Sequence, residues 1–421
     1  MIARRLVRGF SSMGAGESAS VSETFRRLLL RLAIWLRSRV RGVVSVLRIL
    51  HLADLHLGYR PSQPDVPSEV FEERDKVLEQ AVDVAIQRQV HLVLMAGDLF
   101  DDYKPPEPLV ENVLRSLNRL QHGGTLLITV PGNHDEYTYH DSVYRKYRDR
   151  WPGLLVTNPM PEIVHSFTIG DTQLHIVSMA YTAGYTDVSQ PLRKFPEAPG
   201  DGVTIAVLHG TIDSLFNNER SLPLDKDALA RSGYRYIALG HIHTSKRYDL
   251  GDAVAYYPGM VAGKGFSDPG VGSFSLITLV DGTTRIDKID ASVPKWHREE
   301  VETSAYDSYE ALLHHCVQCA QSHSQSLMQI VLKGFAPFPI STERLKTDVG
   351  NCCRYVEVVD ETIGFSEQLL NQLADGRTIR ALFVRKMQEK IRESGNDEEK
   401  RKRYQRALLL GLEALGVGGG D

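Results

Sequence analysis

Short apolar runs alternate with helical patterns between residues 46 and 289, and this alternation limits the fold more than any other feature of the chain. Amphipathic stretches at 71–89 and 108–121 separate the first three runs. The runs lie at 46–54, 90–98, 124–133, 162–170, 172–180, 203–210, 234–241, 272–280 and 284–290. Strands that alternate with helices form βαβ units, in which helices cover a largely parallel sheet, and the later runs in close succession add hairpins. The sequence therefore predicts an α/β domain at 46–293.

The pattern changes after residue 294, where a second, smaller domain is predicted. A helix (305–320), a strand (327–335), a helix (341–349) and a strand (354–360) follow one another. Such a segment is long enough for a compact α+β domain, which we place at 294–362 as a cap on the first domain.

Residues 363–421 are charged and helical, and we interpret them as a C-terminal helical region that could bind a partner. One helical face carries Tyr404, Ala407, Leu408, Leu412 and Leu415. A face of this kind packs onto its own protein or into the groove of a partner, and the sequence leaves both readings open.

The formal net charge of -4 conceals an uneven distribution. Residues 1–48 contain ten arginines and no lysine against Glu17 and Glu23, so this segment is +8 and the remainder is -12. We interpret residues 1–45 as a basic, flexible extension, with a transit-type presequence or a membrane-surface helix as alternatives. An acidic body binds polyanions poorly, so a nucleic-acid substrate would require basic surface from a partner.

Four cysteines in 421 residues argue against a disulfide scaffold and are consistent with a reducing compartment, so we expect a cytoplasmic protein. No run approaches the roughly 20 apolar residues that cross a bilayer. The cysteines are Cys316, Cys319, Cys352 and Cys353. Their pairing resembles a zinc site, but cysteine on a helical repeat is more often a small buried apolar residue.

Polar side chains follow nearly every predicted strand of the first domain. They are Asp54, His56, Asp98, Asn133, His134, Asp135, His209, His241 and His243. Each one alone reads as a turn or capping residue, but five strand ends with such side chains are hard to attribute to chance. Because ligands gather beyond the carboxyl ends of strands in open α/β sheets, we expect these groups to converge.

The chemistry of these side chains indicates divalent metal ions. The set combines imidazoles, carboxylates and one amide and lacks a thiolate, which suits Mn²⁺, Fe²⁺ or Zn²⁺ better than Ca²⁺. Asp54 and His56 are two residues apart and can enter one site. A carboxylate such as Asp98 can bridge two ions roughly 3.5 to 4 Å apart, the arrangement used for in-line displacement at phosphorus.

The motifs DLH, GDLFD, GNHD, HG and GHIH, in this order over about 190 residues, resemble those of the calcineurin-like metallophosphoesterase superfamily. The resemblance implies a four-layer α/β/β/α sandwich with a dinuclear centre, most consistent with two Mn²⁺ ions. It assigns to the first ion Asp54, His56, Asp98 and His243. It assigns to the second ion Asp98, Asn133, His209 and His241. His134 would be a catalytic residue that faces the phosphate, and Asp135 could orient its imidazole and raise its pKa.

Several stretches resemble the DNA-repair exonuclease branch of that superfamily, the nuclease subunits of the SbcD type. They are ILHLADLHLG, AGDLFD and YYPGMVAGKGFSDPG, followed by the α+β cap. In the last of these, Lys264 is expected to bind substrate phosphate, where an arginine would be unsurprising. Some repair nucleases have a histidine where this chain has Asp101, a carboxylate that we expect not to help an imidazole-based mechanism.

The resemblance implies a Mn²⁺-dependent DNA exonuclease, or an endo/exonuclease, that works in DNA repair or end processing with a coiled-coil ATPase subunit. A homodimer is compatible with this reading. The first alternative is a phosphodiesterase or phosphatase that acts on a small nucleotide or a phosphoprotein. The second is a non-catalytic subunit of an ATPase complex with a vestigial metal site, which the complete set of ligands argues against.

Overall fold

The computed structural model describes residues 46–61, 66–182, 189–212, 221–280, 282–334, 340–362, 367–395 and 397–415. The chain separates into two compact units, Met1–Val46 and Leu47–Asp421. The predicted basic extension at 1–45 lies outside the described residues. The finer division of the second unit into three domains stays a prediction. No helix within the described ranges is long and apolar enough to cross a membrane.

Two six-stranded sheets form the first part of the larger unit. The first sheet has the order β14-β13-β1-β2-β3-β4 and the second has the order β11-β12-β10-β7-β6-β5. The strands of the first sheet are β1 (Leu47–Leu52), β2 (Leu92–Ala96), β3 (Leu126–Val130), β4 (Leu154–Leu155), β13 (Ser273–Val280) and β14 (Thr283–Asp290). Those of the second are β5 (Glu162–Ile169), β6 (Thr172–Ser178), β7 (Val203–His209), β10 (Tyr236–Gly240), β11 (Lys246–Leu250) and β12 (Ala253–Tyr257). A small pair, β8 (Thr211–Ile212) and β9 (Pro223–Leu224), completes the strands of this part.

Parallel pairing in the centre of both sheets puts the carboxyl ends of several strands at one edge. β1, β2 and β3 run parallel to one another, as do β6, β7 and β10. The crossovers between the first three strands contain α3 (Ser68–Asp75), α4 (Val77–Gln87) and α5 (Glu107–His122). These are the connections that parallel neighbours require.

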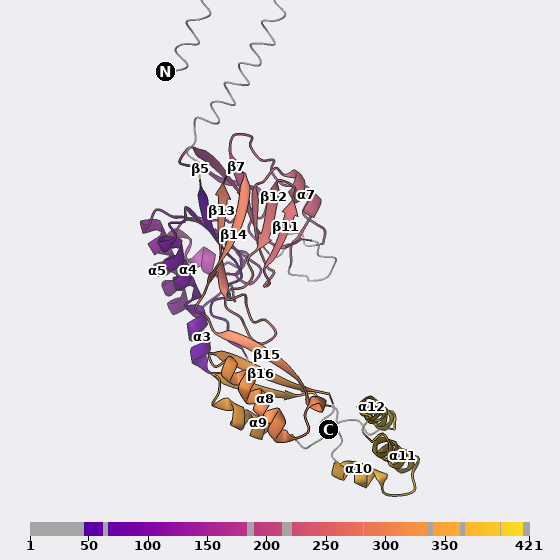
Figure 1. Ribbon diagram of the computed structural model, residues 1–421. Coiled ribbons are helices and arrows are strands. Elements are labelled where there is room, and N and C mark those ends of the chain that lie inside the picture. Colours follow the sequence, from indigo (N-terminus) through magenta and orange to yellow (C-terminus); the bar gives the residue numbers. More distant parts are fainter. Residues whose placement is uncertain are drawn as a thin grey trace, which may run out of the picture. The chain divides into compact units, whose positions relative to one another are not determined.

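Three separate apolar cores show that the two sheets and their helices form four layers (Figure 1). Buried side chains of α4 and α5 pack against one face of the first sheet. The opposite face packs against the second sheet through residues such as Ile128 and Ile205. The outer face of the second sheet packs against Leu229 of α7 (Lys226–Arg231) and neighbouring loops. The α/β/β/α sandwich expected from the motifs is thus confirmed, with a fourth layer built from one short helix and loops.

Short helical turns follow β3 and lie beside the first sheet. They are α6 (Val143–Lys146) and η1 (Arg148–Arg150). Tyr144 of α6 and Trp151 after η1 are buried in the core that the first sheet shares with its helices.

The predicted α+β segment contains three parallel strands covered by two helices. The strands are β15 (Lys295–Glu302), β16 (Ser326–Lys333) and β17 (Tyr355–Asp360). The helical elements are η2 (Thr303–Ala305), α8 (Tyr309–Ser322) and α9 (Thr342–Gly350). Leu312 and Cys316 of α8 and Leu345 of α9 pack onto Met328 and Ile330 of β16. The two helices and two of the strands were predicted, but β15 was not, because its sequence KWHREEVE lacks the apolar alternation of a typical strand.

The C-terminal helices pack on one another. They are α10 (Glu367–Ala374), α11 (Ile379–Glu393) and α12 (Glu398–Ala414). Leu408 and Leu412 of α12 are buried against Val384 and Met387 of α11. Much of the predicted apolar face of α12 is therefore used within the chain, whereas Leu415 remains 39% exposed.

Two elements differ from the sequence-based expectation. The helix predicted at 71–89 is divided into α3 and α4 at Lys76. The break lies two residues after Arg74. The buried side chain of Arg74 extends from α3 and donates hydrogen bonds to carbonyl oxygens of two loops. The hairpin of β11 and β12 was not predicted, since the stretch after the last histidine motif reads as a loop.

Candidate metal centre

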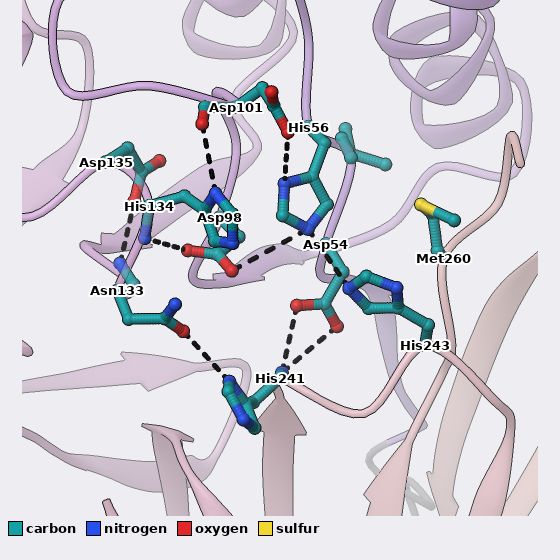
Figure 2. Close-up of polar contacts among 12 residues, drawn as sticks. Asp54, His56, Asp98, Asp101, Asn133, His134, Asp135, His241, His243 and Met260 are labelled. Atoms are coloured by element: carbon teal, nitrogen blue, oxygen red, sulfur yellow. Dashed lines mark hydrogen bonds and ion pairs between the residues drawn. The ribbon is translucent and has the colours of Figure 1, made fainter. Parts of the chain in front are cut away.

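The loops after five parallel strands meet at one edge of the two sheets (Figure 2). β1, β2 and β3 lead into Asp54 and His56, into Asp98, and into Asn133 and His134. His209 is the last residue of β7, and β10 leads into His241 and His243. All seven predicted metal ligands are thus brought together, and their side chains form two groups.

The first group consists of Asp54, His56 and His243, whose ligand atoms lie within 4.8 Å of one another. The Nε2 atoms of His56 and His243 are 3.1 Å apart. His243 Nδ1 lies 2.5 Å from an oxygen of Asp268, so Nδ1 donates its proton there and Nε2 keeps its lone pair for the site. Two imidazole nitrogens that face each other in this way suit a shared cation. These are three of the four residues predicted for the first ion, and the fourth, Asp98, lies in the second group.

The second group consists of Asp98, His209 and His241, also within 4.8 Å of one another. His209 Nδ1 donates to the carbonyl oxygen of Ala96 at 2.9 Å, which turns Nε2 toward the site. Asn133 Oδ1 is 2.9 Å from His209 Nε2 and 2.9 Å from Nδ1 of His241. The group matches the subset predicted for the second ion.

Asp98 lies between the two groups. Its Oδ2 is 3.4 Å from His209 Nε2 in the second group and 3.7 Å from His56 Nε2 in the first. Its Oδ1 accepts a hydrogen bond from the backbone N–H of His134 at 2.8 Å. Among the site's carboxylates, Asp98 is therefore placed to be shared by two ions, as the sequence predicts.

Burial and charge pairing shift the pKa values of the site's ionisable groups in opposite directions. Burial raises the pKa of Asp54 to about 6 and lowers the pKa of His56 to about 4. For His209, burial lowers the pKa, but the carboxylates of Asp98 and Asp54 outweigh burial and raise it to about 9. For Asp98, burial raises the pKa, but the neighbouring imidazoles, His209 first, bring it well below its usual range. The buried, charged carboxylate of Asp98 needs positive charge beside it, and divalent cations can supply that charge.

The backbone of the site is strained. Five non-glycine residues in the described part of the chain have positive φ angles, and four of them, Asp54, His56, Asp98 and His241, belong to the site. Each such residue costs of order 1 kcal/mol or more, and strain of this kind concentrates at functional sites. Gly132 allows close approach, because a Cβ atom there would collide with the Asp98 carboxylate. The strained backbone thus places the side chains of these loops close together.

His134 is partly buried beside the first group, with its ring 4.7 Å from the His56 ring in an edge-on arrangement. Its Nδ1 lies 3.0 Å from the backbone carbonyl oxygen of Asp101 and donates to it. Nε2 is consequently the nitrogen left for a substrate. Asp101 was expected not to help an imidazole, because its side chain is a carboxylate. Its backbone carbonyl group nevertheless orients the His134 ring.

The Asp135 carboxylate bonds groups other than the His134 imidazole that it was predicted to orient. Its Oδ1 accepts from the backbone N–H of Gly132 at 2.8 Å. Its Oδ2 accepts from the backbone N–H of Phe100 at 3.1 Å and from the Tyr144 hydroxyl at 2.7 Å. Both oxygens are therefore used to brace the loops after β2 and β3, and the group that orients His134 is the Asp101 carbonyl.

We expect Asp135→Ala to lower the free energy of unfolding by roughly 3 kcal/mol or more, because it leaves three buried donors without their acceptor at about 1–3 kcal/mol each. Tyr144→Phe should cost only about 1.5–3 kcal/mol, since it removes one bond to a charged group. Urea denaturation of both variants measures the difference. An Asp135→Ala protein of unchanged stability that has lost turnover would instead support the predicted orienting function.

Lys264 pairs with Asp101 within the site, with Nζ 2.8 Å from Oδ1. The same carboxylate oxygen lies 3.1 Å from Nδ1 of His56. Lys264 also lies over the ring of Tyr59, 5.0 Å from its centroid. A substrate phosphate would have to compete with Asp101 for this ammonium group, so the predicted substrate-binding function of Lys264 stays a prediction.

Two supporting residues were missed by sequence reasoning. Asp268 orients His243, and the only signal for it was its place in the loop that resembles repair nucleases. The buried guanidinium of Arg74 donates to the carbonyl oxygens of Leu55, His56 and Gly263. An arginine within an amphipathic helix gives no sequence signal for such a function, because it normally lies on the solvated face.

The four cysteines do not form a cluster of metal ligands in the part of the chain that the structure describes. Cys316 is buried in the core of the cap, and the other three pack at its edge. Cys316 is thus a small buried apolar residue, as expected. Cys319 instead lies close to His297 and His323.

Comparisons with known proteins relate the first part of the chain to a family of phosphoesterases. Residues 47–245 match the sequence profile of the calcineurin-like phosphoesterase family. An uncharacterized metallophosphoesterase of Bacillus subtilis, YhaO, is 24% identical over 312 residues, 70% of this chain and 74% of that protein. The DNA double-strand break repair protein Mre11 of Sulfurisphaera tokodaii is 26% identical over 209 residues, 49% of this chain and 51% of that protein. The alignment thus spans about half the length of this Mre11 relative.

Among solved structures, a dimetal phosphatase from Danio rerio matches 58% of this chain and 96% of its own. The sequence identity is 12% and the TM-score is 0.37.

Proposed function

We propose that this chain, whose residues 47–245 match the calcineurin-like phosphoesterase family, is a DNA exonuclease that depends on two divalent ions, most consistently Mn²⁺. The observation that carries the proposal is the pair of ligand groups with Asp98 between them. Dinuclear centres of this kind hydrolyse phosphate esters. The substrate class comes from the relatives, several of which are Mre11 DNA double-strand break repair proteins.

Two ions at these positions would activate the attacking water and neutralise charge on the phosphate. Asp98 would hold both ions in one place. His134, oriented by the bond from its Nδ1–H to the Asp101 carbonyl, would donate a proton from Nε2 to the phosphate or to the leaving oxygen when its ring is doubly protonated, and it would be left as the neutral Nδ1–H tautomer. Lys264 would contact a neighbouring phosphate once the substrate displaces Asp101.

The proposal includes a partner. A body of net charge -12 outside the first 48 residues provides little attraction for a DNA polyanion, so basic surface has to come from elsewhere. We propose a coiled-coil ATPase subunit that docks on the C-terminal helices. The apolar side chains of Ile379, Leu382 and Leu410 are 80%, 54% and 59% exposed there. Endonuclease activity, a homodimer and a cytoplasmic location are further parts of the proposal.

The test is hydrolysis of end-labelled duplex DNA by the purified full chain with Mn²⁺, beside an EDTA control. We expect metal-dependent shortening of the labelled strand. Bis(p-nitrophenyl) phosphate, a small phosphodiester, is assayed in parallel. Cleavage of the small diester without any shortening of blunt, overhanging or single-stranded DNA would contradict a nuclease that acts without its partner. The site would then either require the ATPase subunit for DNA or belong to a phosphodiesterase of small nucleotides.

A further inference from the structure

A second group of side chains of the types that bind metals lies in the cap, away from the candidate metal centre. Along α8 and just beyond its end, His315, Cys319 and His323 follow one another at intervals of four residues. Residues four apart lie on the same face of a helix. On β15, His297 and Glu299 are two residues apart and point to the same side of the strand. A helix face and a strand face, each rich in donors, could therefore meet.

The structure brings these two faces into contact. The rings of His297 and His323 stack with their centroids 3.7 Å apart and their planes at 14°. Ligand atoms of His297, Cys319 and His323 all lie within 4.8 Å of one another. Three donors from two separate elements therefore lie close together.

The Glu299 carboxylate borders the same point. One of its oxygens is 3.3 Å from Nε2 of His297, and the other is 3.9 Å from Nε2 of His315. Burial raises the pKa of the Cys319 thiol to about 11, and the nearby Glu299 carboxylate adds to this effect. Glu299 is thus close to both the imidazole and the thiol.

The imidazole of His323 is prepared for a cation. Its Nδ1 donates to the carbonyl oxygen of Cys319 at 2.9 Å, which leaves the lone pair on Nε2. Metal-bound histidines usually donate their other N–H to a carbonyl or carboxylate in this way. The side chains of His297 and Glu299 are about one-third exposed, at 30% and 31%, so an ion can enter from solvent.

We propose that His297, Cys319 and His323, with Glu299 as the fourth donor, bind one Zn²⁺ ion. Two imidazoles, one thiolate and one carboxylate form a mixed set that suits zinc, and the two negative charges neutralise the ion. Binding at roughly 2.0–2.3 Å requires one imidazole to turn out of the stack so that both lone pairs converge. The ion would tie β15 to the end of α8. The proposal does not depend on the nuclease function.

The test uses the metal-free full chain titrated with Co²⁺, a spectroscopic probe for zinc sites. Cobalt bound to a thiolate gives a sulfur-to-metal charge-transfer band in the near ultraviolet. The catalytic centre contains no cysteine, so this band reports only on a thiolate site. We expect the intensity of this band to reach a plateau that corresponds to one thiolate-bound Co²⁺ ion per chain. Addition of Zn²⁺ should displace the Co²⁺ and remove the band.

Variants assign the band to its ligands. Cys319→Ser should abolish it, and His323→Gln should weaken Co²⁺ binding by at least tenfold. The matched controls are Cys352→Ser and His314→Gln, which replace a cysteine of the same core edge and an exposed histidine of the same helix. Both controls should keep the band at full intensity.

Three results would overturn the proposal. They are absence of the band in the unaltered chain, its retention in Cys319→Ser, and its loss in Cys352→Ser, which would indicate a site built from other cysteines. Circular dichroism confirms that each variant is folded. If Cys319→Ser does not fold, His297→Gln is used in its place, because a half-buried strand residue tolerates an amide. This variant must then show the same loss of Co²⁺ binding.

Discussion

Asp98→Ala is expected to reduce hydrolysis by roughly 10³-fold or more and to lower the metal content of the purified protein below two ions per chain. A shared metal ligand supports several kcal/mol of charge stabilisation, and each 1.36 kcal/mol is a factor of ten in rate. Asp98 lies within 3.7 Å of an imidazole nitrogen in each ligand group, so its loss affects both positions. Turnover of bis(p-nitrophenyl) phosphate and elemental analysis of dialysed protein measure the two effects.

The matched control is Asp102→Asn on the same loop. Asp102 is exposed, and its Oδ1 accepts from the backbone N–H of Lys104 at 2.8 Å, a bond that an amide oxygen can also accept. This variant should keep its activity and both ions. An Asp98→Ala protein that retains two ions and full turnover would show that the two ligand groups do not form one dinuclear centre.

The convergence of the ligands could be predicted because it follows from topology. Parallel neighbours such as β1, β2 and β3 place their carboxyl ends at one edge, and Asp54 or Asn133 need only follow the strand directly. The apolar runs that form these strands are buried on both faces and are therefore easy to recognise. The four layers were expected only from the resemblance of the motifs to those of the metallophosphoesterase superfamily.

The supporting contacts could not be predicted, because they depend on the path of loops between distant residues. His243 and Asp268 are 25 residues apart, and their contact requires the loop after β12 to fold back over the site. Asp135 is next to His134 in sequence, which suggested a contact, but its carboxylate points to Phe100 and Tyr144. Adjacent side chains on a loop need not point the same way.

The group of His297, Cys319 and His323 could not be predicted for a related reason. Cys319 was considered with the other cysteines, whereas its neighbours in space are His297 and His323. His297 lies on β15, a strand with too few apolar residues to be recognised from its pattern. Without that strand, no sequence argument brings the imidazole to the end of α8.

His134→Ala is expected to lower kcat by about 10²–10⁴-fold, the usual contribution of a positioned acid or base, and to leave the metal content unchanged. Its imidazole belongs to neither of the two ligand groups assigned to the ions, and its Nδ1 is occupied by the Asp101 carbonyl at 3.0 Å. The side chain can therefore act on the substrate through Nε2 without holding an ion. The Asp98 carboxylate keeps its hydrogen bond in this variant, because that bond comes from the backbone N–H of residue 134.

Elemental analysis beside steady-state kinetics separates this function from a structural one. His140→Ala is the matched control, since its side chain lies six residues further along and is 96% exposed. It should behave like the unaltered protein. Loss of an ion in His134→Ala would make His134 a ligand, as its proximity to His56 and Asp101 permits. Full turnover with both ions bound would remove it from the mechanism, and proton transfer to the leaving oxygen would then have to come from solvent.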